Sequence, residues 1–531
     1  MRKIPRRPLK KVPPVKADQL QENHDTKDIP ATPLPYSYED KLALLKPYTD
    51  KNQDLVTRPF YLNNDEKRPG SAFFINGVVD NQLLNEHILK PLMLADVPVA
   101  NEIAPGRELD FIIRTSINAG QVRTTDNQAE MIHGIFDGMA VIIFENIQEA
   151  VIIDIHGGPV RSLEEPPGEK SVQGPREGFV EILDINLALV RRRLRNPRLV
   201  VKRTAVGRRT RTSVAVLYID DIADQDLVEE VNYRLDQIDT DMILDATSLI
   251  QYIEDDPFSP FPQIWVSERP DKVLAELMEG RIAVMVDGSP TAFFLPTLFV
   301  EFFQASEDYF ERTYTGSFLR FLRYLAFFLA VSLPAIYIAL ASFDPELMPT
   351  NLVVSLGQSR KEVPFPVFLE ILIQIFIIEL IIEAGLRLPG QVGQTAGVVA
   401  GIIMGQAAIS AKLASPAVII VIAIATICTF TLPSGPLVQS TRILRLPLMV
   451  ITAVFGLYGF SLGWVFILAH LSSLESLGIP YFAPFAPLRP ADLKDGFYRT
   501  WLWKMDQRPT SIPTQQKRRQ GTTRYKENED E

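Results

Sequence analysis

Four polar residues in an otherwise apolar segment are the strongest candidates for chemistry in this sequence. Glu370, Gln374, Glu379 and Glu383 lie between residues 367 and 386, among Ile, Leu, Val and Phe side chains. An acid near the centre of a membrane span costs about 2.5–3.5 kcal/mol to insert, so this helix needs protein neighbours or water. Because acids inside membranes commonly mark ion pathways, the four residues are candidates for a cation pathway. The alternative is that they are protonated or paired structural contacts.

Helical spacing limits how these four residues can act together. At about 100° per residue, Glu370 and Gln374 share one face, whereas Glu379 and Glu383 lie on nearly the opposite face. A straight helix therefore cannot direct all four at one lumen. We expect one polar pair to line a pathway and the other to bond neighbouring helices.

Glycines at four-residue spacing form a second pattern in the apolar half. Gly393, Gly397, Gly401 and Gly405 would lie on one face of a helix, where the absence of side chains lets another helix approach closely. The pattern predicts a helix-packing seam. A functional version is that helices slide along this seam during gating.

Motifs typical of enzymes find no support. The stretch 459–463, Gly-Phe-Ser-Leu-Gly, fits a hydrolase nucleophile pattern but lies in an apolar run rather than at a strand-to-helix turn. The five histidines do not occur at metal-site spacing, and Cys428 is the only cysteine. The sequence predicts no enzyme, no metal site and no cofactor.

The basic run 191–195, with further basic residues up to Arg211, predicts either a phosphate or lipid-headgroup site or a salt-bridged helix face.

The elements that must position these residues divide the chain into a polar half and an apolar half. The chain has 531 residues and a net charge of −10, which argues against a general nucleic-acid binder. We predict an α/β soluble N-terminal half with two subdomains, followed by a C-terminal all-α transmembrane bundle. The expected parts are a disordered charged tail (1–57), soluble subdomains (58–158 and 159–290), a bundle of about five helices (291–486) and a polar tail (487–531).

The expected membrane spans are near the twenty residues that cross hydrocarbon. They cover residues 318–341, 367–386, 392–412, 416–433 and 446–471, and we expect 291–304 to form a short interfacial or re-entrant helix. Basic residues flanking the first span, including Arg320 and Arg323, favour a cytoplasmic soluble half. Five crossings would place the tail after Leu471 on the opposite side, although that tail is also basic.

Several motifs, in order along the chain, resemble the A subunits of GerA-type spore germination receptors. The first is Gly174-Pro175-Arg176-Glu177-Gly178-Phe179, followed by the helix through residues 186–193 and by Val206-Gly207-Arg208-Arg209-Thr210. Further matches are 257–263 (Pro-Phe-Ser-Pro-Phe-Pro-Gln), 268–271, 307–312, 363–366, 405–408 and 415–417. The agreement runs from about residue 60 to residue 490.

The resemblance implies a multi-pass protein of the spore inner membrane or cell membrane. It also implies a transporter-like B subunit and a lipoprotein C subunit as partners, and a homo-oligomer. The implied function is to trigger germination as a nutrient-gated cation channel. The alternative is a non-conducting accessory or scaffold paralogue of the dipicolinate-release machinery.

Overall fold

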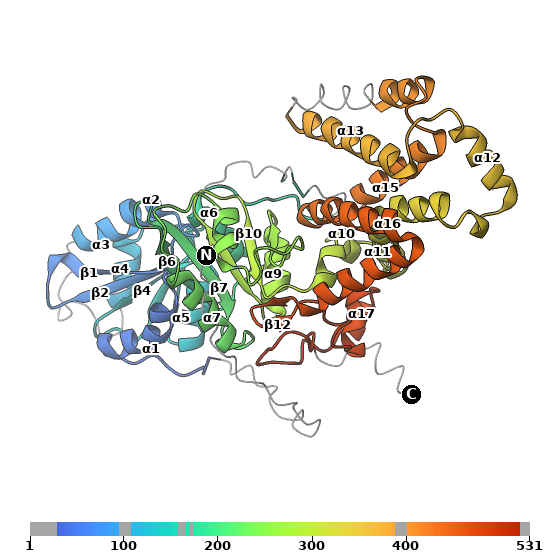
Figure 1. Ribbon diagram of the computed structural model, residues 1–531. Helices are drawn as coiled ribbons and strands as arrows, with labels where there is room; N and C mark the ends of the chain where they lie inside the picture. The colour runs from blue at the N-terminus through green and yellow to red at the C-terminus, as the bar shows by residue number, and fades with distance from the viewer. Residues whose placement is uncertain are drawn as a thin grey trace. The chain divides into compact units, whose positions relative to one another are not determined.

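The computed structural model describes residues 29–94, 108–157, 166, 168–169, 174–387 and 401–520 (Figure 1). The chain forms two compact units. The first, here called the N-terminal unit, comprises Met1–Glu254, Ile264–Pro296 and Asp506–Gly521. The second, here called the helical unit, comprises Asp255–Gln263 and Thr297–Met505.

The first sheet of the N-terminal unit has five antiparallel strands in the order β1-β2-β4-β5-β3. All residues of β4 and β5 are buried, because helices cover both faces of the sheet. Helices α1 and α5 pack on one face, and a π-helical turn, α3 and α4 pack on the other. The strands β1 to β5 are Leu55–Tyr61, Pro69–Ile75, Val122–Thr125, Ala140–Phe144 and Ala150–Ile153. The helices α1 to α5 are Tyr38–Lys51, Asn81–Leu83, Lys90–Leu94, Glu108–Ser116 and Gln128–Phe136, and the π-helical turn between α2 and α3 is Leu84–Leu89.

The second sheet is also antiparallel, in the order β6-β7-β9-β10-β8. Two α/β subdomains were predicted, and the two sheets confirm that fold class. The strands are Leu199–Val206, Thr212–Ile219, Trp265–Ser267, Ile282–Val286 and Ala292–Leu295; the helices α6 to α9 are Leu183–Arg193, Gln225–Asp236, Ala246–Ile253 and Pro270–Met278. Residues 291–304 are thus not the expected interfacial helix: they form β10 and a buried 3-10 turn, Phe299–Phe303.

Part of the expected disordered tail is folded. Helix α1 begins after Ser37, whose side chain accepts a hydrogen bond from the Asp40 backbone, and it buries Leu45 in the first core. Lys41 is also buried and donates to the carbonyl of Phe144 (3.0 Å). Burial lowers the pKa of the Lys41 ammonium to about 8. The low apolar content of this segment concealed a helix that tertiary contacts stabilise, whereas residues 1–28 lie outside the described residues.

A buried ion pair connects the two subdomains of the N-terminal unit. Arg191 of α6 contacts Asp54, just before β1, with Nε–Oδ2 at 2.7 Å and Nη2–Oδ1 at 2.9 Å. Both side chains are 1% exposed, and the guanidinium also donates to Asn52 and to the Leu199 carbonyl. The first residue of the basic run is therefore a structural ion-pair member, and Arg193 likewise pairs with Glu177.

Replacing Arg191 with Ala should destabilise the N-terminal unit by about 3–5 kcal/mol, because Asp54 would remain as a buried charge without its partner. Pulse proteolysis of the full chain in urea would measure this loss. Arg195→Ala, at an exposed position of the same run, is the matched control and should have little effect. Equal stability of both variants would contradict the structural role of Arg191.

The C-terminal segment does not form the expected free polar tail, because it returns to the N-terminal unit. Thr514 forms a β-bridge with Ala223, and Gln515 donates its backbone N–H to the Ile222 carbonyl (2.9 Å). Arg508 donates to the Met278 carbonyl (2.7 Å). Described residues that precede and follow the helical unit along the chain therefore belong to one folded unit. The number of membrane crossings stays a prediction.

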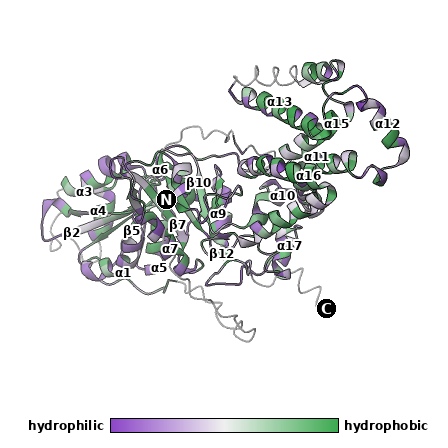
Figure 2. Cartoon of the chain, in the orientation of Figure 1, coloured by the Kyte–Doolittle hydropathy of each residue, from purple (hydrophilic) through white to green (hydrophobic). Residues whose placement is uncertain are grey.

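The helical unit contains the apolar helices of the chain (Figure 2). By length and composition, α11 (Thr313–Ser342) and α16 (Gly435–Ser473) are able to cross a membrane. The predicted spans 367–386 and 416–433 also form helices, α13 (Val367–Arg387) and the shorter α15 (Pro416–Phe430). Of the predicted span 392–412, residues 392–400 lie outside the described residues, and Gly401–Ser410 form a helix. Short helices α10 (Glu307–Phe310), α12 (Thr350–Arg360) and α17 (Leu493–Gly496) complete the unit.

Helix α16 is not one straight span, because the chain reverses at Gly456. This residue has φ +60° and ψ −143°, a conformation that only glycine adopts readily. A Cβ atom on Gly463 would lie 2.4 Å from the side chain of Leu448, so the arms 435–455 and 457–473 pack against each other. Residues 446–471 therefore do not form one straight helix, and how they cross a membrane stays a prediction.

A side chain at position 456 should disturb this helical hairpin. Gly456→Ala would force an unfavourable backbone conformation and place a methyl group 3.0 Å from the Phe343 ring. We expect a loss of about 1–3 kcal/mol, seen as a lower melting temperature of the full chain in detergent. Gly435→Ala, where nothing lies within 4 Å of the added carbon, is the control. A Gly456→Ala variant that melts with wild type would refute a strained turn.

A buried ionic cluster holds the start of α11. Asp308, fully buried, contacts Arg323 (Oδ1–Nη2, 2.7 Å) and Arg320 (Oδ2–Nε, 3.3 Å). Arg320 also pairs with Asp495 (3.0 Å), and Arg323 donates to the Phe303 carbonyl (2.9 Å). These arginines, which the sequence suggested as flanking charges, thus lie inside the helix and fix neighbouring segments to it.

Candidate functional site

Helix α13 carries the four predicted pathway residues and begins directly after Pro366. The Pro366 carbonyl accepts the backbone N–H of Glu370 (3.0 Å), which starts the helical hydrogen-bond ladder. The first half of the helix is largely buried, whereas the second half exposes Phe376, Leu380 and Glu383. The two halves therefore offer different environments to their acids.

Glu370 belongs to α13, and its fully buried carboxylate lies at the N-terminus of α15. Its Oε1 accepts hydrogen bonds from the backbone N–H (2.5 Å) and the hydroxyl (2.7 Å) of Ser415, the residue that precedes α15. Its Oε2 lies 3.6 Å from Nε of Arg360 in α12. A carboxylate at a helix N-terminus is stabilised by the free N–H groups and the helix dipole. Glu370 therefore joins three helices, α12, α13 and α15.

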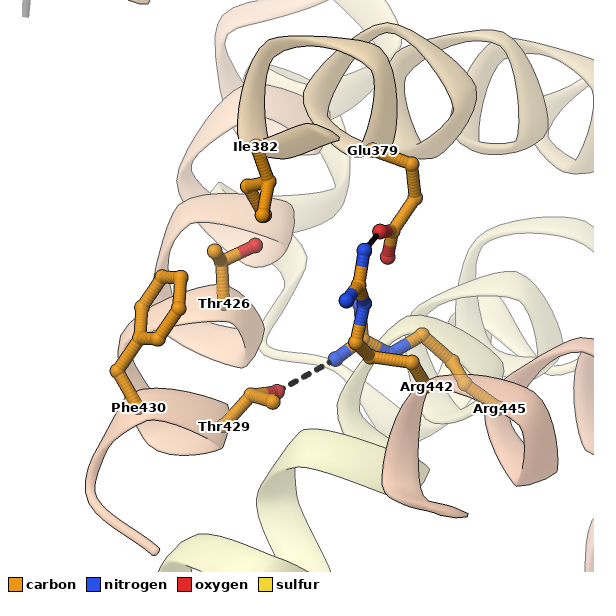
Figure 3. A pocket seen from close by; sticks show the side chains of 7 residues that line it. All are labelled: Glu379, Ile382, Thr426, Thr429, Phe430, Arg442 and Arg445. Atoms are coloured by element: carbon orange, nitrogen blue, oxygen red, sulfur yellow. Dashed lines mark hydrogen bonds and ion pairs between the residues drawn. The ribbon is translucent and has the colours of Figure 1, made fainter. Parts of the chain in front are cut away.

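Glu379 faces a small pocket formed by α13, α15 and α16 (Figure 3). Its carboxylate forms an ion pair with Arg442, and the figure shows the Arg442 side chain extended toward it. Arg445 lies beside this pair and donates to Thr429 (2.8 Å). The lining residues are Glu379, Ile382, Thr426, Thr429, Phe430, Arg442 and Arg445.

The other two predicted pathway residues, Gln374 and Glu383, do not take part in the contacts of Glu370 or Glu379. Gln374 is buried, at 8% exposure. Glu383 is exposed on the same helix and pairs with Arg387 one turn later (2.7 Å). The structure thus separates the acids into a buried helix-capping group, a pocket group and an exposed group, and within this chain they do not surround one lumen.

The glycine seam falls partly outside the described residues, because Gly393 and Gly397 are among those not described. At Gly401 and Gly405, no atom among the described residues lies within 4 Å of an added Cβ. The described part of the chain therefore leaves this half of the seam uncovered, and helix packing there stays a prediction.

The motif residues of the first half lie in loops and ion pairs. Gly174 has φ +108° and is exposed, Gly178 is buried, and the Pro175 carbonyl accepts from Arg269 (3.2 Å). Arg208 pairs with Asp239, and Arg209 lies 3.5 Å from Asp241. Arg176 is exposed, and Glu177 pairs with Arg193.

The proline-rich loop Asp255–Gln263 is a further candidate, although residue chemistry alone gave no signal for it. Its ends continue into α8 and β8 of the N-terminal unit, yet it packs within the helical unit. The Pro262 carbonyl accepts the Tyr481 hydroxyl (2.5 Å), and Ser259 contacts His470 at the end of α16 (2.9 Å). The Asp255 carboxylate accepts the Leu477 N–H (2.7 Å). The loop is therefore held within the helical unit by its contacts with the end of α16 and the segment that follows it.

Two sheets carrying helices and a separate body of apolar helices define a membrane protein with a large N-terminal α/β part. The family described as "Bacillus/Clostridium GerA spore germination protein" matches residues 43–511. This chain therefore belongs to the GerA family and is a spore germination receptor A subunit.

Named relatives agree with this assignment. Spore germination protein KA of Bacillus subtilis is 36% identical over 91% of this chain and 88% of its own length. Spore germination protein GerLA of Bacillus cereus is 38% identical over 84% of this chain and 89% of its own. The uncharacterized membrane protein YfkQ of Bacillus subtilis is 35% identical over 92% and 93%. The crystal structure of the N-terminal domain of the A subunit of the Bacillus megaterium germinant receptor GerK3 covers 51% of this chain and 99% of its own, at 32% identity and TM-score 0.40.

The two environments of the acids predict different costs of removal. Glu370→Ala would leave the Ser415 donors buried and unpaired, and should destabilise the chain by about 1–3 kcal/mol. Glu383→Ala removes only an exposed pair within one helix, worth about 0.3–0.5 kcal/mol. Melting temperatures of the full chain in detergent would rank the variants. A larger loss for Glu383→Ala would contradict the assigned environments.

Proposed function

We propose that this chain assembles as an oligomeric, nutrient-gated cation channel of the spore inner membrane. In this proposal it works with a transporter-like B subunit and a lipoprotein C subunit and has no catalytic role. The membership in the receptor family supports a germination function, and the exposed Glu383 of α13 supplies a group that attracts cations. Nutrient binding elsewhere in the receptor would reach the helices of this chain through its connected loops.

The observation that carries the channel proposal is the exposed half of α13. Glu383 is 56% exposed, and Phe376 and Leu380 of the same half are 64% and 54% exposed. A charge that faces lipid is costly, whereas the same charge is readily hydrated at a water-filled lumen. Because the described part of the chain does not cover this face, it is suited to face a central lumen formed by several copies.

The loop Asp255–Gln263 supports a route for gating. Its covalent ends lie in α8 and β8, and its contacts with His470 and Tyr481 hold the end of the α16 hairpin and the segment that follows. We propose that a conformational change that reaches this loop passes to the end of α16 through these two contacts.

Monovalent-cation release from spores would test the channel role. We expect Glu383→Gln to slow nutrient-triggered potassium release several-fold or to change its ion preference, because the lumen would lose negative charge. Glu362→Gln is the matched control, since Glu362 is also exposed and paired, with Lys412, but lies outside α13. Immunoblots of the inner membrane would check protein abundance and location.

Unchanged release by Glu383→Gln and Glu379→Gln, at normal abundance, would refute a conduction role for these acids. It would favour the non-conducting accessory or scaffold function in dipicolinate release. Absence of the protein from the inner-membrane fraction would refute the location.

A further inference from the structure

The pocket between α13, α15 and α16 carries an excess of positive charge. Arg442 and Arg445 line it together with one acid, Glu379, which pairs with Arg442. Arg445 is 3% exposed, and no carboxylate among the described residues pairs with it. A buried charge without a counter-charge is strongly unfavourable in a low-dielectric interior.

The hydrogen bonds of Arg445 leave donors available. Its Nε donates to the Ala330 carbonyl (2.9 Å), and its Nη2 donates to the Thr429 hydroxyl (2.8 Å). Both acceptors are neutral, and a guanidinium has five N–H donors. These bonds orient the side chain but do not balance its charge. At least two N–H groups remain for a ligand.

The other polar groups of the pocket are already committed. Thr426 and Thr429 donate their hydroxyl protons to the carbonyls of Ile422 (2.8 Å) and Ala425 (2.9 Å). The hydrogen-bond donors that remain free therefore belong to the arginines. Ile382 and Phe430 form the apolar part of the pocket wall. The free space is about that of one water molecule or one small ion.

We propose that this pocket binds a small monovalent inorganic anion, of which chloride is the representative, between Arg442 and Arg445. The anion supplies the missing counter-charge of Arg445 and accepts its free N–H groups (Figure 3). A cation is disfavoured there because it would face two guanidinium groups and one carboxylate. The site depends on the pocket alone and holds whether or not the chain conducts ions.

Anion binding to the folded chain must raise its thermal stability. The purified full chain in detergent would be heated in sodium gluconate, whose anion is too large for the pocket, and in increasing sodium chloride at constant ionic strength. We expect the melting temperature to rise with chloride and to saturate. A melting temperature that is the same in both salts would overturn the proposal.

Three variants separate an anion site from a purely structural arginine. Arg445→Gln should weaken the chloride response at least about tenfold, since a charged donor is lost. Glu379→Gln should strengthen it, because the competing carboxylate charge is removed. Lys361→Gln removes one exposed positive charge elsewhere in the helical unit and should leave the response unchanged. A weaker or unchanged response in Glu379→Gln would overturn the proposal.

A second measurement keeps the test decisive if Arg445→Gln does not fold. Equilibrium dialysis of the wild-type chain with radioactive chloride should show one saturable site per chain. Unlabelled bromide should displace the label, whereas gluconate should not. Absence of saturable binding would mean that the pocket holds water only and would overturn the proposal.

Discussion

The return of residues 506–520 to the N-terminal unit is the constraint on which the arrangement of this chain depends. The bridge between Thr514 and Ala223 and the contacts of Arg508 place the last described segment beside α7 and α9. Segments from both sides of the helical unit in the sequence therefore meet in one folded unit. If that unit lies on one side of a membrane, an even number of crossings is expected, and a basic C-terminal segment on the same side agrees with that expectation.

Buried charged side chains also determine how this chain packs, and each of them is neutralised or hydrogen-bonded in a different way. Asp54 and Arg191 neutralise each other between two subdomains, and Asp308 holds two arginines at the start of α11. Glu370 accepts hydrogen bonds from Ser415 at the N-terminus of α15 and also lies 3.6 Å from Arg360. Buried pairs of this kind add little net stability but strongly disfavour arrangements that separate them. They therefore specify which segments meet.

The sequence was sufficient for features that depend on local pattern and composition. Two α/β subdomains, an apolar C-terminal half and a helix carrying Glu370 and Glu379 all follow from periodicity and hydropathy. Contacts between distant residues were not accessible in this way. Helix α1 lacks a clear apolar stripe and is stabilised by burial of Lys41 and Leu45, so its composition resembled that of a tail.

In the candidate site too, features set by neighbouring residues could be predicted from the sequence, whereas contacts between distant residues could not. The opposite faces of Glu370 and Glu379 follow from helical geometry, and the structure gives them different partners, Ser415 and Arg442. Neither partner could be deduced, because each lies more than forty residues away in the chain. The reversal at Gly456 was hidden for a related reason: a glycine within an apolar run is compatible with both a straight helix and a turn.

The position of residues 506–520 also determines the order in which the molecule can be completed during synthesis. The edge formed by Ala223 and the carbonyl of Met278 leaves the ribosome early, but its partner residues leave only after the whole helical unit. Every apolar helix must therefore be delivered to the membrane before the N-terminal unit acquires its final contacts. Until then, the unfinished edge is available to chaperones or to neighbouring copies, and ribosomal arrest within the helical unit would leave it open.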